Sequence, residues 1–242
     1  MLKLIHGEIY RLLHKKSLYI YFGALAAGYF LLAFVRSGGF SDETIVKDAI
    51  NFFQLLPALA GGLLFSAIYT DDLNSKNLIT LVGFGINKTK IVVAKFILMI
   101  VFGAVVFGLM PLFHYAVYAV LGFAATASQM AMIYAVALKF MLMTLAFSAI
   151  ASIVVYGLQR TTFAVVSYIL LAFSVVGTLI TAVSNVLELN ITQHLMSGIT
   201  DRILTAIISG GSLTLPVAEY IVYMAIVVTI SAVAFNKKEM EF

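Results

Sequence analysis

Three ionisable side chains lie inside long apolar stretches of this sequence: Lys139, Glu219 and His114. A charge within a membrane is costly and usually faces a helix bundle or water, so each is a candidate for a polar site inside the membrane. Lys139 lies about eight residues inside its apolar run, or about 12 Å at helical rise. Its ammonium could reach outward to the interface. Alternatively, it could pair with Glu219 across a bundle, either to hold helices together or to line a substrate path.

No catalytic or metal-binding pattern accompanies these charges. The sequence lacks the HExxH, GxSxG and P-loop patterns of metalloproteases, serine hydrolases and nucleotide-binding proteins. It contains no cysteine. Its four histidines, which are scattered along the chain, are His6, His14, His114 and His194. We therefore expect no enzyme activity, no metal site and no cofactor in this chain itself.

The composition is typical of a chain that crosses a membrane. Of the 242 residues, 62% are hydrophobic and 11% charged, and the mean hydropathy is +1.07; soluble domains carry roughly 25% charged residues. Apolar runs of about 18 or more residues predict membrane spans. Such runs cover 17–35, 49–69, 91–112, 131–156, 162–183 and 216–235. The sequence therefore predicts an all-α membrane protein with one transmembrane domain over residues 1–242.

Basic residues predict the orientation of these spans, because short cytoplasmic loops are enriched in Lys and Arg. One side of the predicted membrane carries Lys3, Arg11, Lys15, Lys16, Lys76, Lys88, Lys90, Lys95, Arg160, Lys237 and Lys238. The other side carries only Arg36, Lys47 and Arg202. Both termini are thus expected in the cytoplasm. The net charge of +4 is explained by topology and predicts no nucleic-acid partner.

Three segments outside the spans have patterns of their own. Residues 1–16 place apolar side chains at helical spacing, with Glu8, Arg11 and Lys15 on another face, which predicts an amphipathic helix in the cytoplasmic interface. The alternative is a solvated basic flank. Residues 112–128 exceed what one span needs and predict an outer helix end and turn, or else a re-entrant hairpin. Residues 184–215 predict short helices that lie on the outer leaflet or dip into it.

The polar segment 70–90, between the second and third spans, has the most specific pattern. Asp71 and Asp72 are placed where a helix N-terminus favours negative charge. Leu78, Leu81 and Val82 follow as an apolar stripe at helical spacing. Gly83 and Gly85 then end the helix, Asn87 and Lys88 make a turn, and Lys95 begins the next span. An ordinary positive loop is the alternative, but such a loop requires neither the stripe nor the glycine break.

This arrangement resembles the permease subunits of ABC-2 type transporters. The residues that carry the resemblance are Asp71-Asp72, Gly85-Ile86-Asn87-Lys88 and Ala94-Lys95. Six spans with inside termini, an N-terminal interfacial helix and polar outer helices before the last span are also what the family implies. The family's usual Glu and Gly-Thr before the turn are replaced here by DDLNSKN. The small size is most similar to permeases of bacitracin and lantibiotic self-protection exporters.

The resemblance implies a function in transport, with antibiotic resistance or immunity as its setting. Its expected partners are an ABC nucleotide-binding subunit that holds ATP and Mg, a second permease copy or a related permease, and membrane lipid. It implies an exporter in a bacterial cytoplasmic membrane that moves an amphipathic peptide, antibiotic or lipid-like substrate. The residues expected to couple the chain to the ATPase are Asp71, Asp72, Lys76, Leu78, Leu81, Gly85, Asn87 and Lys88.

Two other functions remain open on the sequence alone. The first is an ion-coupled secondary transporter or channel that uses Lys139 and Glu219 as its polar site. The second is a purely structural membrane subunit of a larger assembly. Dependence of transport on ATP would favour the permease, whereas dependence on an ion gradient and on Lys139 would favour the secondary transporter.

Overall fold

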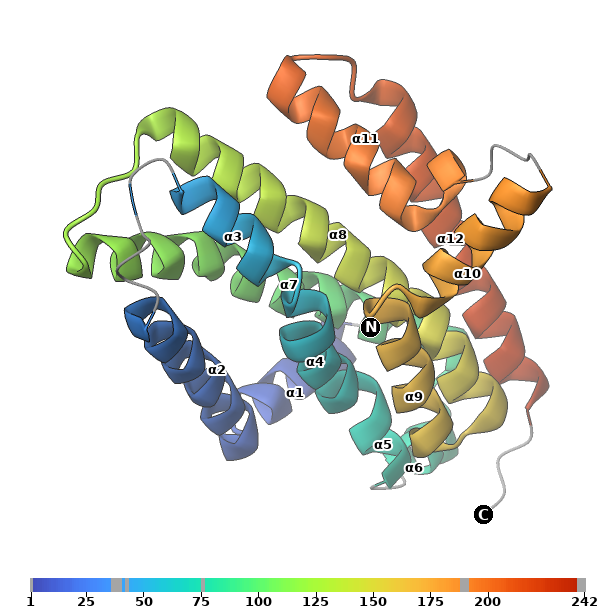
Figure 1. Ribbon diagram of the computed structural model, residues 1–242. Helices are drawn as coiled ribbons and strands as arrows, with labels where there is room; N and C mark the ends of the chain where they lie inside the picture. The colour runs from blue at the N-terminus through green and yellow to red at the C-terminus, as the bar shows by residue number, and fades with distance from the viewer. Residues whose placement is uncertain (1, 36–40, 42–43, 75–76, 188–191, 239–242) are drawn as a thin grey trace.

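In the computed structural model the chain folds as a bundle of helices, and the structure describes residues 2–35, 41, 44–74, 77–187 and 192–238 (Figure 1). Every regular element in these ranges is helical. The α-helices are α1 (Leu2–Leu13), α2 (Lys16–Val35), α3 (Ile45–Phe53), α4 (Gly62–Phe65), α5 (Asp71–Asn74), α6 (Asn77–Gly83), α7 (Lys88–Val120), α8 (Ala127–Leu158), α9 (Thr161–Ala172), α10 (Val175–Val186), α11 (Met196–Ser209) and α12 (Thr214–Lys237). Two π-helical turns, η2 (Pro57–Gly61) and η3 (Ser66–Thr70), and a 3-10 turn, η4 (Thr192–His194), complete the set.

Five helical segments are long and apolar enough to cross a membrane, and a bent pair makes up to six. The five are Lys16–Val35, Ile45–Leu73, Lys88–Val120, Ala127–Leu158 and Thr214–Lys237. The pair consists of Thr161–Ala172 and Val175–Ser184, which meet at 57°. These five or six segments confirm the prediction of a helical multi-pass membrane protein. The predicted span 162–183 corresponds to the bent pair and not to one straight helix.

The apolar surplus after residue 112 continues α7 as one helix to Val120. Pro111 lies inside this helix, as membrane helices tolerate. The chain then turns through Gly122, whose φ of 87° favours glycine. Thr126 begins α8 with a capping box, in which its hydroxyl accepts from the Gln129 backbone N–H at 3.3 Å and its own N–H donates to the Gln129 side chain at 2.8 Å. The predicted helix end and turn are therefore present, and the re-entrant alternative is not.

The second span is a continuous helical rod in which α3, α4 and α5 are joined through the two π turns. The Tyr168 hydroxyl donates to the Pro57 carbonyl at 2.6 Å, at the start of η2. Gly61 makes this approach possible, because a Cβ there would overlap the Tyr168 hydroxyl and lie 2.7 Å from the Thr144 methyl. The glycine is thus required by close packing between the second span and the α8–α9 pair.

Helix α8 is the centre of the bundle, and α7, α9, α11, α12 and α3 all pack against it (Figure 1). Its buried face carries small side chains such as Ala146, Ala149 and Ala151, which let neighbouring helices approach closely. Helix α2 stands at the edge of the bundle, with only Leu18, Tyr29 and Ala33 of its side chains buried. Most of its apolar surface is therefore free to contact lipid or another protein.

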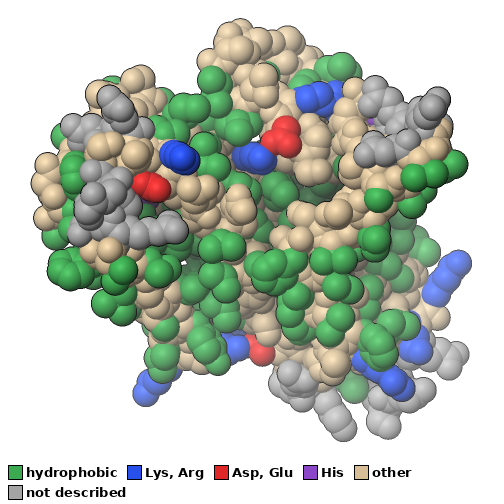
Figure 2. All heavy atoms as spheres, viewed as in Figure 1, with side chains coloured by type: hydrophobic (Ala, Val, Ile, Leu, Met, Phe, Trp, Pro, Cys, Tyr) green, Lys and Arg blue, Asp and Glu red, His purple; other side chains and the backbone are tan. Residues whose placement is uncertain are grey.

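We call the basic end of the bundle the one that carries Lys88 and Lys90 at the start of α7 and Lys237 at the end of α12. There the Asn236 amide donates to the Thr89 hydroxyl at 3.0 Å, which joins the end of α12 to the start of α7. The opposite end carries the start of α3, the 121–126 turn and α11. In Figure 2 the charged side chains lie mainly in an upper and a lower zone, and apolar side chains cover the zone between them. This distribution is typical of a protein that crosses a membrane.

Candidate functional site

The 70–90 segment contains two short helices, α5 and α6, where its pattern predicts one helix that begins at the aspartates. Helix α5 continues the helical rod of the second span, so Asp71 and Asp72 do not lie at a free helix N-terminus. Asp71 and Asp72 lie in the first turn of α5, and α6 ends at Gly83. Gly85 has a φ of 77°, a conformation that glycine adopts without strain. Asn87 is the N-cap of α7, where its side chain accepts from the Thr89 backbone N–H at 2.8 Å. Asn87 therefore has a structural role that is sufficient to explain its position in the turn.

A buried cluster of four charged side chains lies where this segment meets the bundle. We call Glu8, Arg11, Asp72 and Lys95 the ionic cluster. Lys95 binds the Glu8 carboxylate at 2.7 Å and also contacts the Asp72 carboxylate. Arg11 binds Asp72 at 3.0 Å and Glu8 at 2.7 Å. The cluster thus joins α1, α5 and α7, which are remote from one another in the sequence.

The ionic cluster is charge-balanced, and three of its four side chains are buried. Asp72 is 0% exposed, Lys95 2% and Glu8 5%, whereas the Arg11 side chain keeps 34% of its surface exposed. Two carboxylates face two cations, and the Asn77 amide donates to Asp72 at 3.3 Å. Buried charges of this kind are tolerated when each is paired, and removing one partner leaves an uncompensated charge. The cluster therefore resists any change that separates its three helices.

The ionic cluster corrects the orientation expected for the N-terminal helix. The helical spacing predicts that Glu8 and Arg11 lie on a polar face away from the apolar one, but both form ion pairs with residues of the bundle. One pattern could have identified Glu8: it lies three residues after Ile5 and four before Leu12, within the stripe that packs on the core. An acidic residue in such a stripe requires a buried cation.

The expected coupling residues occupy different environments. Leu78 is buried in the chain's own core, and Leu81 and Val82 pack partly against the core, so the apolar stripe of α6 mainly faces the bundle. Phe84, which the sequence analysis did not select, is instead 80% exposed at the tip of the segment. Lys88 donates to the Lys238 carbonyl at 2.6 Å. Lys76 lies outside the described residues.

Lys139 and Glu219 do not bind each other; each binds a residue of α11. Lys139 contacts Asp201 at 2.5 Å, and Glu219 accepts from Arg202, with one contact at 3.4 Å. Because Asp201 and Arg202 are adjacent, α11 is held to α8 by one residue and to α12 by the next. The sequence predicts that residues 184–215 lie on the outer leaflet or dip into it, and this pattern does not indicate that Asp201 and Arg202 pair with the spans.

His114 is fully buried near the opposite end and binds two other elements. Its Nε2 lies 3.0 Å from the Ile45 carbonyl, and its Nδ1 contacts the Tyr29 hydroxyl. One turn further along α7, the Tyr118 hydroxyl donates to Asp48 at 2.5 Å. These contacts join α2, α3 and α7, so His114 has a structural role. Within the described residues, no three His, Cys, Asp or Glu side chains are grouped as a metal site would require.

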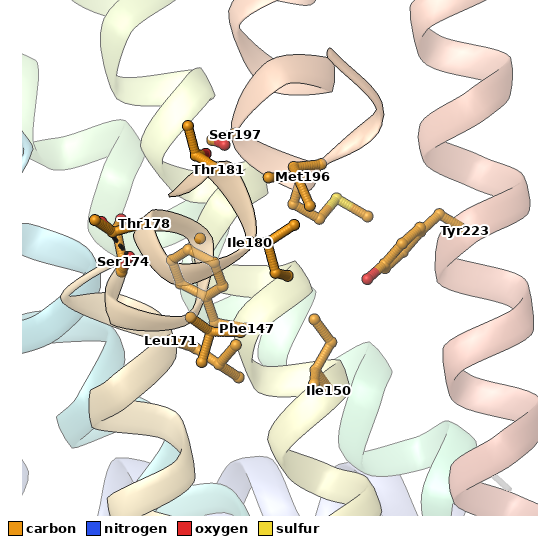
Figure 3. A pocket seen from close by; sticks show the side chains of 13 residues that line it. Phe147, Ile150, Leu171, Ser174, Thr178, Ile180, Thr181, Met196, Ser197 and Tyr223 are labelled. Carbon is orange, nitrogen blue, oxygen red and sulfur yellow. Dashed lines mark hydrogen bonds between the residues drawn. The ribbon is translucent and has the colours of Figure 1, made fainter. Parts of the chain in front are cut away.

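Two neighbouring cavities lie at the bend between α9 and α10. The Tyr223 cavity, of about 410 Å³, is bounded by α8, α9, α10, α11 and α12. Figure 3 shows Tyr223 of α12 facing Ile180 of α10 across this cavity, with Ile150 of α8 below. The Lys139 cavity, of about 350 Å³, lies between the second span, α8 and α11. Ser174 and Ser197 line both, so the two cavities adjoin.

Comparison with known proteins finds no match: no family model, no curated protein and no solved structure matches the chain. The resemblance carried by residues 71–95 is therefore an expectation from the sequence. Any functional conclusion rests on that motif together with the geometry of the ionic cluster, the exposed tip at Phe84 and the two cavities.

Proposed function

We propose that this chain is the permease subunit of an ATP-driven exporter of the ABC-2 type, in which a separate nucleotide-binding subunit hydrolyses ATP. In this proposal the bent pair α9–α10 is the sixth crossing, α1 is the interfacial helix and α6 is the coupling helix. Both termini and the basic end lie in the cytoplasm of a bacterium. A second copy or a related permease completes the transport path, and the weakly buried helices α2 and α12 offer surfaces for it.

The observation that carries the proposal is the contact of α6 with the ionic cluster, in which the Asn77 amide at the start of α6 donates to Asp72 at 3.3 Å. Asp72 belongs to the rod of the second span, Lys95 to the third span and Glu8 to α1. A subunit that pushes or pulls on α6 would therefore move three elements together, because separating them would expose or unpair buried charges. An ordinary loop between two spans does not require such a connection.

The exposed tip supplies a surface for the ATPase. Phe84 is 80% exposed on the short turn between α6 and α7. Aromatic residues that enter a pocket of a partner commonly contribute much of the binding free energy. Leu78 instead fixes α6 to the bundle, since it is buried in the core. In the proposal, Phe84 enters the ATPase cleft and Leu78 keeps α6 seated while force is applied.

The proposal is tested by purifying the tagged chain from membranes of its native host. We expect a P-loop ATPase to co-purify in a fixed ratio, and Phe84→Gln to lose it, because the aromatic anchor is removed. Leu158→Gln is the matched control, since Leu158 is also an exposed apolar residue at the basic end. It should keep the ATPase. Absence of any P-loop ATPase with the wild-type chain, or full retention by Phe84→Gln, would overturn the proposal.

The ion-coupled alternative expects Lys139 and Glu219 to form one polar site. The observed pairs, Lys139 with Asp201 and Glu219 with Arg202, do not favour it. Its own test is transport in vesicles that contain no ATP and carry an imposed ion gradient. Uptake that is abolished by Lys139→Gln under these conditions would replace the permease proposal.

A further inference from the structure

The two cavities at the α9–α10 bend differ in what lines them. The Tyr223 cavity is lined mainly by hydrocarbon from Phe147, Ile150, Leu171, Ile180 and Met196, with serine and threonine hydroxyls along one side. In Figure 3 these apolar side chains point toward one another from α8, α9, α10 and α11. Its volume of about 410 Å³ falls in the range of roughly 300–1,000 Å³ that is usual for small-molecule sites. The Tyr223 cavity therefore suits the hydrocarbon chain of a ligand.

The Lys139 cavity adds a positive charge beside this apolar space. Lys139 is the only charged residue among the described residues that line either cavity. Its side chain is 19% exposed, whereas that of its partner Asp201 is 55% exposed and does not line the cavity. An ammonium has three donors, so Lys139 can keep Asp201 and still bind an anion from the cavity side.

The bend itself shows that this region is specialised. Ser174 has a φ of 57°, which is uncommon for a residue other than glycine, and it lines both cavities. The broken helix is consistent with a binding site, because irregular backbone at membrane depth is tolerated only inside protein or beside a cavity. Strained residues of this kind gather at ligand sites and switches. The Thr178 hydroxyl satisfies the Ser174 carbonyl at 2.9 Å.

The start of helix α11 closes one side of these cavities. Leu195, Met196 and Ser197 contribute lining at its start. The ion pairs of Asp201 with Lys139 and of Arg202 with Glu219 then fix the helix to the spans on either side. Because one of these pairs uses Lys139, a ligand that binds the Lys139 ammonium also contacts the group that holds α11 in place.

We propose that the two cavities together bind one membrane amphiphile with a single hydrocarbon chain and an anionic headgroup. The chain occupies the Tyr223 cavity, and the headgroup binds Lys139 next to the Ser174 and Ser197 hydroxyls. A membrane is the natural source of such a ligand. That this amphiphile is the cargo rests on the proposed function, whereas its binding requires no ATPase.

The absence of tryptophan from the chain allows a direct test. Phe147→Trp places the chain's only tryptophan at the Tyr223 cavity, and Ile180→Trp provides a second reporter if the first variant fails to fold. Ile226→Trp is the control, since Ile226 is 55% exposed on α12 and does not line either cavity. Each protein is placed in phosphatidylcholine nanodiscs and titrated with 9,10-dibromostearate, whose bromine atoms quench tryptophan on contact. The uncharged methyl ester of the same acid is titrated in parallel.

The expected result is saturable quenching of the cavity reporter at probe levels that quench the Ile226→Trp control only weakly. Adding Lys139→Gln to the cavity reporter should weaken dibromostearate binding about tenfold or more, because a hydrogen bond to a charged group is lost. Binding of the methyl ester should be unchanged by Lys139→Gln.

Two outcomes would overturn the inference. Equal, non-saturating quenching of the cavity and control reporters would show that the Tyr223 cavity binds no hydrocarbon chain. Equal binding of acid and ester, unaffected by Lys139→Gln, would show that the headgroup site is wrong. Because no ATPase is present, either failure is distinct from failure of the permease proposal, which depends on co-purification of the ATPase.

Discussion

At the scale of single residues, two adjacent aspartates have very different surroundings. Asp72 is fully buried in the ionic cluster, whereas the side chains of Asp71 and its partner Lys15 are 28% and 33% exposed. The stability lost when one partner of an ion pair is removed depends on such burial, because water screens an exposed pair but not a buried one. The pair of aspartates therefore offers a matched comparison within one turn of helix.

We predict that Asp72→Asn lowers the free energy of unfolding by about 3–5 kcal/mol, because it leaves a buried positive charge without its partner. Asp71→Asn should cost only about 0–1 kcal/mol, as is usual for exposed pairs. The stability of both variants is measured by thermal unfolding in detergent, with size-exclusion chromatography to follow the loss of folded protein. Asp72→Asn combined with Lys95→Met restores the charge balance of the cluster, so it should recover part of the loss. Equal stability of the two single variants would contradict the assignment of the cluster.

At the scale of helices, the second span depends on the absence of a side chain at Gly61. We predict that Gly61→Ala destabilises the bundle by about 1–3 kcal/mol, because the new methyl overlaps the Tyr168 hydroxyl and forces the helices apart. Gly62→Ala is the matched control, since its Cβ would meet Tyr168 at an ordinary contact distance of 3.6 Å. Its stability, measured by the same thermal unfolding, should change little.

A second variant separates overlap from other effects of the glycine. Tyr168→Phe removes the hydroxyl that a Cβ at Gly61 would meet, although it also removes the donor to the Pro57 carbonyl. Gly61→Ala should therefore cost less in a Tyr168→Phe background than in the wild type. Equal costs in the two backgrounds would show that the close approach of α9 is not what requires glycine.

At the scale of the whole molecule, the number of crossings depends on whether the bent pair α9–α10 spans the membrane. The absence of cysteine allows single-cysteine labelling at Thr89, Ser128 and Ser212. A membrane-impermeant maleimide applied to intact cells should label Ser128→Cys and Ser212→Cys, and should label Thr89→Cys only after the cells are opened. The reason is that six crossings place the basic end inside and both other sites outside.

Ser212 makes this experiment decisive for the bent pair. It follows α11 and precedes α12, so it reaches the outside only if α9 and α10 together cross the membrane. Labelling of Ser128→Cys without Ser212→Cys would leave five crossings and place the C-terminus outside. Labelling of Thr89→Cys in intact cells would reverse the predicted orientation of the whole bundle.

The sequence by itself determined the features that are set within a few turns of helix. Long apolar runs predict helices because a backbone in lipid must satisfy its own hydrogen bonds, and α2, α7, α8 and α12 formed where those runs lie. The glycine break at 83–85 likewise depends on local geometry and is present, and Asn87, predicted to lie in a turn, is the N-cap of α7.

Only the tertiary structure decided which charges meet. Lys95 and Glu8 are 87 residues apart, and Lys139 binds a helix of the outer segment, for which the sequence indicated no partner. A periodic pattern indicates which face of a helix is apolar, but it does not say which helix covers that face. Packing between distant segments therefore forms the ionic cluster, the inward side of α1 and the cavities beside Ser174. Burial also requires each charge in the cluster to have a partner, because an unpaired buried charge strongly destabilises the fold.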